Sequence, residues 1–91
     1  MPQTVILKRP LRRLTNGLES VEVQGETVNE IFNQLEVRFP GIRKKLCTGD
    51  GDLHQFINVY VDGENIRFLD RLQTAVRDRS KVWIATAIAG D

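Results

Sequence analysis

The chain has 91 residues and a mass of 10.4 kDa, which is the size of one small domain. Hydrophobic residues make up 41% and charged residues 27%, which argues against a disordered, collagen-like or coiled-coil chain. The formal net charge of +1 gives little long-range attraction, so neither nucleic acid nor a membrane is expected as a partner. We therefore expect a single domain over 1–91, with 88–91 as a flexible tail.

Cysteine use and hydropathy indicate the compartment. The one cysteine, Cys47, cannot form an internal disulfide, and with the one histidine, His54, it supplies too few ligands for a usual zinc site. The first residues do not lead from a basic segment into an apolar run, and no window approaches the roughly 18 apolar residues of a membrane span. We expect a cytoplasmic protein with no bound metal and no bound cofactor.

The first half of the chain predicts two strands and a helix. Residues 4–8 are β-branched and apolar, and residues 20–24 alternate polar residues with valines, so both segments predict strands joined by a hairpin-like connection. Thr27 and Glu30 have the spacing of a capping box, which marks the start of a helix. Pro40-Gly41 ends this helix. Its apolar stripe is formed by Val28, Ile31, Phe32, Leu35 and Phe39.

The second half predicts three more strands. Residues 56–61 are a dense run of β-formers, and Asp62-Gly63 is the signal for a two-residue type I′ turn. Residues 64–68 should therefore pair antiparallel with this run. Residues 81–88 resume an apolar β-pattern and predict the fifth strand.

The order β-β-α-β-β-β predicts an α+β fold of the β-grasp type, in which a mixed five-stranded sheet holds one main helix on one face. Alternation along the strands then directs one set of side chains towards the helix, namely Val5, Leu7, Val21, Val23, Val82 and Ile84. It directs the other set to the opposite face, namely Ile6, Lys8, Trp83, Ala85 and Ala87. Tyr60 and Trp83 are either ordinary sheet residues or, if both are exposed on that face, interface anchors.

Few residues suggest chemistry within the chain. Asp50, Asp52 and Glu64 could form a metal or acid–base site, but a polar loop and a hairpin carry such residues in any case. Cys47 has only His54 as an imidazole partner, so a buried structural thiol is the favoured interpretation. No catalytic residue and no metal ligand is expected, and the protein is not expected to be an enzyme.

Basic residues fall in three groups in the sequence. Acidic residues are interspersed and aromatic residues are few, whereas surfaces that bind single-stranded nucleic acid combine basic residues with stacking aromatics. Solvated faces are therefore the favoured interpretation of these groups, which are Arg12-Arg13, Arg43-Lys44-Lys45 and Arg77-Asp78-Arg79.

Two segments carry a resemblance to a known family, FINVYVDGENIRFLD at 56–70 and VWIATAIAG at 82–90. Together with the Phe39-Pro40-Gly41 helix end, and in this order, they resemble the ubiquitin-like sulfur carriers of prokaryotes. That family contains the small subunit of molybdopterin synthase, the thiamine-pathway sulfur carrier and the carrier that supplies a cysteine synthase. The resemblance is strongest to the carrier for cysteine synthase.

The resemblance implies a reaction cycle at the C-terminal carboxylate. A ubiquitin-activating-type enzyme uses ATP to adenylate the terminal glycine, and sulfur then replaces AMP to give a thiocarboxylate. A sulfur-accepting synthase, either cysteine synthase or the large subunit of molybdopterin synthase, takes the sulfur. We therefore expect tail chemistry at Ala87, Ile88, Ala89, Gly90 and Asp91, and we expect partners to dock on the sheet face around Tyr60, Trp83 and Ala85.

Asp91 departs from the family pattern, because the family ends in Gly-Gly and here Gly90 is followed by aspartate. A side chain with a second carboxylate could clash in a channel shaped for glycine, and it adds negative charge beside the phosphates of ATP. The tail could be processed, tolerated by the activating enzyme, or altered or engineered. Alternatively, the chain has lost carrier activity and is a non-conjugating ubiquitin-like binding or regulatory module.

Overall fold

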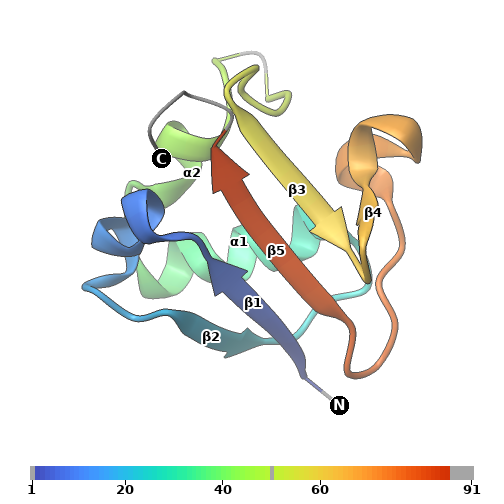
Figure 1. The fold of residues 1–91 in the computed structure, drawn as a ribbon, viewed down its shortest axis with the longest axis horizontal. Coiled ribbons are helices and arrows are strands. Elements are labelled where there is room, and N and C mark those ends of the chain that lie inside the picture. Colours follow the sequence, from blue (N-terminus) through green and yellow to red (C-terminus); the bar gives the residue numbers. More distant parts are fainter. Residues whose placement is uncertain (1, 50, 87–91) are drawn as a thin grey trace.

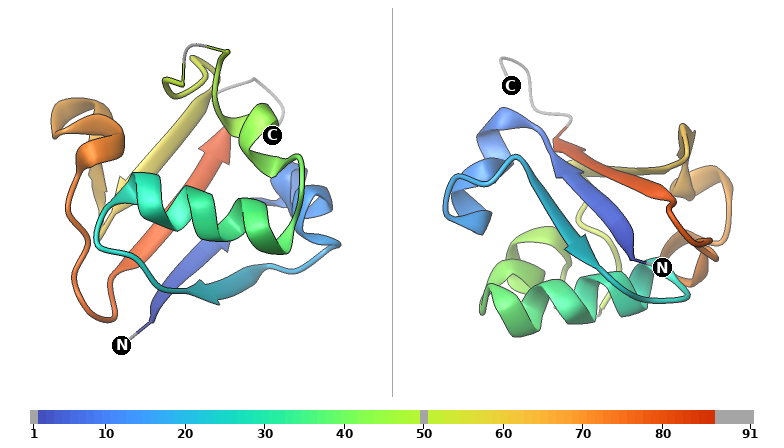
Figure 2. Two further views of the ribbon diagram at one scale, coloured as in Figure 1. Left: turned by 180° about the vertical axis from the view of Figure 1, so that it is seen from behind. Right: turned by 90° about the horizontal axis from the view of Figure 1, so that it is seen from below.

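The computed structural model of the protein describes residues 2–49 and 51–86. The described residues form a mixed five-stranded sheet in the order β2-β1-β5-β3-β4, and α1 packs across one face of this sheet (Figures 1 and 2). This arrangement confirms the predicted α+β fold of the β-grasp type. The strands are β1 (Gln3–Leu7), β2 (Ser20–Val23), β3 (Ile57–Val61), β4 (Glu64–Asn65) and β5 (Lys81–Thr86). The helices are α1 (Val28–Arg38), α2 (Ile42–Leu46) and the 3-10 helices η1 (Arg9–Thr15), η2 (Ile66–Phe68) and η3 (Arg71–Gln73).

Strand β5 lies in the middle of the sheet. It pairs parallel with β1 on one side and antiparallel with β3 on the other. The strand was predicted over 81–88, and Ala87 and Ile88 lie outside the described residues. Strand β1 begins and ends one residue earlier than the predicted range 4–8.

Helix α1 begins where the capping box predicts. The side chain of Thr27 accepts a 3.2 Å hydrogen bond from the backbone N–H of Glu30. The carboxylate of Glu30 accepts from the N–H of Glu26 at 3.0 Å, one residue before the position that a capping box uses. The predicted apolar stripe faces the sheet, with Phe39 half-buried and the other four members fully buried, namely Val28, Ile31, Phe32 and Leu35.

The alternation predicted for the sheet is confirmed. The side chains on the helix side are all buried and belong to one continuous core, whereas those on the outer face are half-buried or exposed. The buried set comprises Val5, Leu7, Val21, Val23, Val82 and Ile84. The half-buried set on the outer face includes Ile6, Trp83 and Ala85.

Strands β1 and β2 pair antiparallel, as the predicted hairpin-like connection requires, but the sequence did not predict that the connection is helical. This connection is the 3-10 helix η1, which ends at Asn16 in the left-handed conformation with φ 57°. The Arg12 guanidinium donates a 3.1 Å hydrogen bond to the carbonyl of Leu7, so η1 is held against the end of β1. Thr15 is fully buried, and its hydroxyl lies 2.8 Å from the carbonyl oxygen of Leu18.

Helix α2 is a second element that the sequence did not predict. The basic group at 43–45 lies in a five-residue helix that follows directly on Pro40-Gly41. Arg43 fixes this helix to α1, because its guanidinium donates to the side-chain oxygens of Asn29 at 2.7 Å and Asn33 at 3.0 Å. These contacts join two different helices, so the periodicity of neighbouring residues in the sequence does not predict them.

The prediction of a strand over 64–68 is correct for its first two residues, which form β4, and wrong for the other three, which form η2. The turn itself is as expected, since Asp62 and Gly63 both have positive φ, at 49° and 91°, as a type I′ turn requires. After β4 the chain turns into η2, and Ile66 enters the core with no exposed surface. The side-chain oxygen of Asn65 accepts the N–H of Arg67 at 2.9 Å, which caps this turn and ends the ladder.

Candidate functional site

The strand that leads to the predicted tail is held by its neighbours up to its last described residue. Thr86 of β5 is in register with Ile57 of β3, and Ile84 is in register with Leu7 of β1. The segment predicted to carry the chemistry follows at once, and it lies outside the described residues. Its members are Ala87, Ile88, Ala89, Gly90 and Asp91.

A row of side chains crosses the outer face of the sheet at Trp83. Trp83 is in register with Ile6 of β1 and with Tyr60 of β3, and Tyr60 is in register with Asn65 of β4. Residues in register on adjacent strands point to the same face, so these side chains are neighbours. The structure therefore brings Tyr60 and Trp83 together as predicted, each half-buried. Their role in docking stays a prediction.

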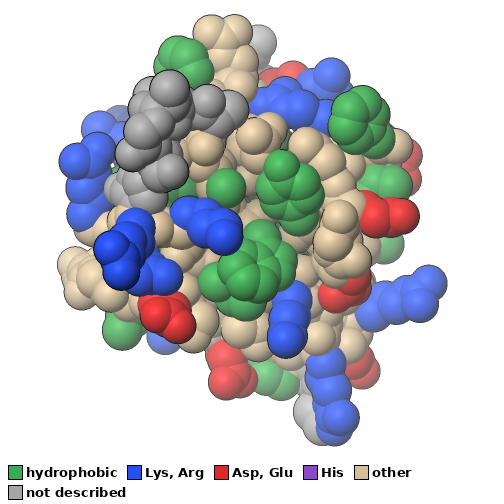
Figure 3. Space-filling view, viewed as in Figure 1, with side chains coloured by type: hydrophobic (Ala, Val, Ile, Leu, Met, Phe, Trp, Pro, Cys, Tyr) green, Lys and Arg blue, Asp and Glu red, His purple; other side chains and the backbone are tan. Residues whose placement is uncertain are grey.

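Ala85 and Lys8 extend this face, which we call the outer face. Ala85 lies two residues beyond Trp83 on β5, in register with Asn58, and is half-buried. The ammonium of Lys8 lies 5.0 Å from the centre of the Trp83 ring, a cation–π distance. Figure 3 shows hydrophobic side chains near the middle of this face, with Lys and Arg side chains around them. The outer face thus presents aromatic area with a cation beside it.

Sequence reasoning missed a pair of exposed apolar side chains at the edge of the sheet. Phe68 is 87% exposed and Leu69 is 41% exposed, and both follow β4 in the segment of η2. The expected strand over 64–68 would have turned Phe68 to the same face as Ile66. The 3-10 helix η2 replaces the strand, so the alternation does not hold there. The exposure of Phe68 could have been predicted only by recognising this 3-10 helix in the sequence.

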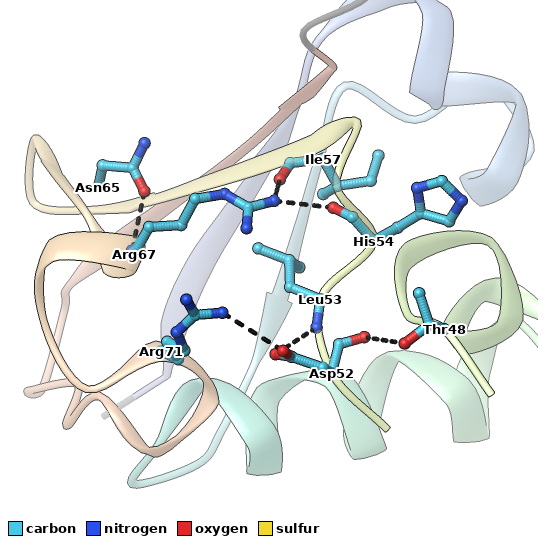
Figure 4. A network of polar contacts seen from close by, with 8 residues as sticks. All are labelled: Thr48, Asp52, Leu53, His54, Ile57, Asn65, Arg67 and Arg71. Carbon is cyan, nitrogen blue, oxygen red and sulfur yellow. Dashed lines mark hydrogen bonds and ion pairs between the residues drawn. The ribbon is translucent and has the colours of Figure 1, made fainter. Parts of the chain in front are cut away.

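The acidic and imidazole candidates of the polar loop serve local structure (Figure 4). The carboxylate of Asp52 accepts the N–H of Leu53 at 2.8 Å and pairs with Arg71 at 3.3 Å. The Nδ1 of His54 accepts the N–H of Phe56 at 3.3 Å, and the two rings lie 4.5 Å apart. These contacts hold the loop before β3 in place.

Arg67 ties the same loop to η2. Its guanidinium donates to the carbonyl of His54 at 2.9 Å and to that of Ile57 at 2.8 Å (Figure 4).

The other acidic candidates do not form a site with Asp52. Glu64 is exposed on β4, and Asp50 lies outside the described residues. Within 2–49 and 51–86, no three His, Cys, Asp or Glu side chains are grouped so that they could hold a metal ion.

Cys47 is buried, as the favoured interpretation requires, with 6% of its surface exposed. Burial raises the pKa of its thiol, and this effect exceeds the opposing influence of the Arg43 guanidinium. A thiol with a raised pKa is a poor nucleophile at neutral pH.

In the part of the chain that the structure describes, no helix is long and apolar enough to cross a membrane.

The five-stranded mixed sheet with α1 across one face defines a small ubiquitin-like domain of the β-grasp type. The model of the ThiS family matches residues 5–90, and the chain belongs to this family. The match ends at Gly90, one residue before Asp91.

Similar proteins agree with this membership. The chain is 38% identical to the sulfur carrier protein CysO of Mycobacterium tuberculosis, over 99% of both chains. A solved structure of M. tuberculosis CysO has a TM-score of 0.88 at 36% identity, covering 94% of this chain and 99% of that one. A chain of the Amycolatopsis orientalis BexX/CysO complex has a TM-score of 0.91 at 42% identity, covering 98% and 99% respectively.

Proposed function

We propose that this protein is a sulfur carrier that is activated at its C-terminal carboxylate and donates sulfur to a biosynthetic enzyme. Membership of the ThiS family and similarity to proteins named sulfur carrier protein CysO support the proposal. The protein supplies the carboxylate and the docking surface, and partner enzymes supply the catalysis.

The chemistry proceeds in two displacements. In the adenylating partner, a carboxylate oxygen attacks the α-phosphorus of ATP and pyrophosphate leaves, which gives an acyl-adenylate. A sulfur nucleophile then attacks the acyl carbon and AMP leaves, so that the terminal group becomes a thiocarboxylate. Activation is needed because a free carboxylate is a poor acyl electrophile, and the adenylate lowers the barrier by providing a good leaving group. ATP is a substrate of the partner, and the proposed chemistry needs no cofactor on this chain.

The observation that carries the proposal is the place of Trp83 and Ala85 on β5. They lie on the outer face beside Tyr60, and they precede the C-terminal segment by only a few residues. Five residues reach at most about 17 Å when extended. An enzyme that docks on the outer face therefore has the terminal carboxylate within a short reach of its own active site.

For the sulfur acceptor we propose a synthase of the cysteine-forming type, with the molybdopterin and thiamine pathways as the alternatives. Similarity to CysO over nearly the whole chain supports this choice. A chain similar to this one has been crystallised in a BexX/CysO complex, which supports a protein partner for this chain as well.

Intact-mass measurement tests the proposal. The protein is incubated with ATP, the adenylating enzyme of the same host and a sulfide donor. We expect a mass gain equal to the difference between sulfur and oxygen, which requires both ATP and the enzyme. If no adenylate and no thiocarboxylate form with any adenylating enzyme of that host, the proposal is wrong.

Asp91 favours one second candidate, a ubiquitin-like binding module without tail chemistry. Its terminal side chain replaces the glycine that the resemblance implies for activation. Such a module would bind its partner through the outer face, and a Trp83→Ala change would weaken that binding. Binding in the absence of any mass change would favour this second function.

A further inference from the structure

A pocket of about 360 Å³ lies where η1 meets the junction of α1 and α2, and we call it the corner pocket. Figure 2 shows η1 beside the adjoining ends of these two helices in both of its views. None of the outer-face residues Tyr60, Trp83 and Ala85 lines the corner pocket. It is therefore a separate feature from the surface assigned to the carrier function.

Three cations from three different elements surround the corner pocket. Arg13 comes from η1, Arg38 is the last residue of α1, and Lys45 comes from α2, and all three are exposed. No residue that lines the pocket carries a carboxylate. Among the described residues, no carboxylate forms an ion pair with any of the three cations. Like charges held close together without a counter-charge attract an anionic group.

The neighbouring carboxylate of Glu36 does not neutralise this charge. Its two oxygens accept the backbone N–H groups of Gly41 and Arg43, each at 2.9 Å, and it lines a different cleft beside Cys47. Arg38 is held in place at the pocket, because it donates a 2.6 Å hydrogen bond to the backbone carbonyl of Glu22. A backbone carbonyl carries no net charge, so this hydrogen bond orients the guanidinium without neutralising its positive charge.

The floor of the corner pocket is apolar. Leu14 and Phe39 are half-buried and pack against the core, and Ile42 is buried within it. The backbone N–H of Gly41 donates to Glu36 and that of Ile42 donates to Phe39, so neither is available to a ligand. A bare phosphate would meet the three cations but neither of these two backbone donors, whereas an apolar side chain flanked by carboxylates would match both the apolar floor and the basic rim.

We infer that the corner pocket binds an acidic segment of a partner protein. One apolar side chain of that segment lies over Phe39, and carboxylates on either side of it pair with Arg13 and Lys45. This interaction does not depend on the chemistry of the tail. It allows a protein to stay attached at the corner pocket while another partner uses the outer face.

An NMR titration tests the inference with a defined probe. The ¹⁵N-labelled protein is titrated with the peptide acetyl-Asp-Glu-Leu-Phe-Glu-Asp-amide at low ionic strength. We expect the largest amide shift changes at residues of the corner pocket, above all Asn16, Gly41 and Lys45, and weaker binding as salt screens the charges. Shift changes confined to other basic surfaces, such as the one at Arg77, would contradict the inference.

A pair of adjacent variants provides the matched control. Lys45→Glu removes a cation of the corner pocket, whereas Lys44→Glu makes the same charge change on the same helix but in the cleft beside Cys47. We expect Lys45→Glu to weaken the peptide by about tenfold and Lys44→Glu to weaken it far less. Equal losses in the two variants would show general electrostatic attraction and would overturn the inference.

Two further probes identify the class of ligand. The same peptide with Asn and Gln in place of its acidic residues should bind at least about tenfold more weakly. Inorganic phosphate should not compete with the acidic peptide at equal concentration. Equal binding of the neutral peptide, or displacement by phosphate, would show that an acidic protein segment is the wrong ligand.

Discussion

The carboxylate of Asp62, in the turn between β3 and β4, accepts a 2.8 Å hydrogen bond from the hydroxyl of Ser80. Its other oxygen accepts the backbone N–H of Lys81 at 3.0 Å. Ser80 is buried, with 3% of its surface exposed, and its hydroxyl oxygen also accepts the N–H of Arg77 at 2.9 Å. The turn that ends β3 therefore also fixes the residue at which β5 begins.

Replacement of Asp62 tests this link. Asp62→Ala should lower the free energy of unfolding by about 1–3 kcal/mol, because the buried Ser80 hydroxyl loses its acceptor. Asp62→Asn keeps a side-chain oxygen and tolerates the positive φ, so its loss should be smaller. Urea denaturation measures both values. Equal losses in the two variants would show that the side-chain oxygen does not matter.

Phe32 is the largest fully buried side chain of the core. Phe32→Ala should lower the free energy of unfolding by roughly 3–5 kcal/mol, since it removes a ring from between α1 and the sheet. Val37→Ala, on the same helix and 75% exposed, is the control and should change stability by less than about 0.5 kcal/mol. An unchanged urea midpoint for Phe32→Ala would contradict the burial of this ring.

Glu36 makes part of the stability depend on pH. The backbone N–H groups of Gly41 and Arg43 hold the pKa of its carboxyl below the ordinary value. A group whose pKa is lower in the folded state stabilises the fold above its unfolded pKa, which is about 4.3 for glutamate, and this contribution is lost as the pH falls through the folded pKa. The stability of the native protein should therefore fall more steeply with decreasing pH than the stability of the Glu36→Gln variant. Thermal unfolding followed from about pH 6 to pH 3 measures the difference.

A second carboxylate variant separates this effect from a general loss of negative charge. Glu22 lies on the exposed side of β2, so Glu22→Gln removes one carboxylate at a different place. A flattening of the pH profile that is larger for Glu36→Gln than for Glu22→Gln would assign the effect to the hydrogen bonds of Glu36. If Glu36→Gln follows the native profile, the hydrogen bonds to Glu36 do not stabilise the fold.

Asp91 is the decisive residue for the carrier proposal. If it blocks activation, Asp91→Gly should raise the ATP-dependent yield of adenylate and thiocarboxylate, because a glycine fits a channel that excludes side chains. Intact mass reports the yield, and the protein recovered from its host shows whether Asp91 is removed in the cell. A host protein that retains Asp91, with no activation of either form, would support the binding module.

The elements predicted from the sequence are those whose signals are local. Thr27 and Glu30 predict the start of α1, because a capping box satisfies nearby backbone N–H groups. Asp62-Gly63 predicts the hairpin, because both residues tolerate the positive φ of a type I′ turn. The alternation in β5 also predicted that Trp83 and Ala85 share the outer face, and the structure adds Tyr60 of β3 beside Trp83. A central strand buried on one face and half-covered on the other has little freedom to change this register.

The elements that were missed depend on contacts between distant residues. Helix α2 has only five residues, and it relies on contacts with α1: Glu36 accepts its first N–H groups, and Arg43 binds Asn29 and Asn33. Strand β4 stops early because Ile66 turns into the core, which exposes Phe68. The corner pocket likewise joins three basic residues that are far apart in sequence, and neither composition nor periodicity brings such residues together.

The central place of β5 has a mechanical consequence. If a partner draws the C-terminal segment away from the sheet, as the proposed function requires, the pull acts along this strand, towards the end at Thr86. The hydrogen bonds to β3 run across the direction of pull, and those to β1 hold the opposite side, so tension loads both ladders in shear. Bonds loaded in this way share the force, whereas an edge strand would peel away one bond at a time. Tension on the C-terminal segment is therefore spread over the two strands that flank β5, and the sheet resists it as a unit.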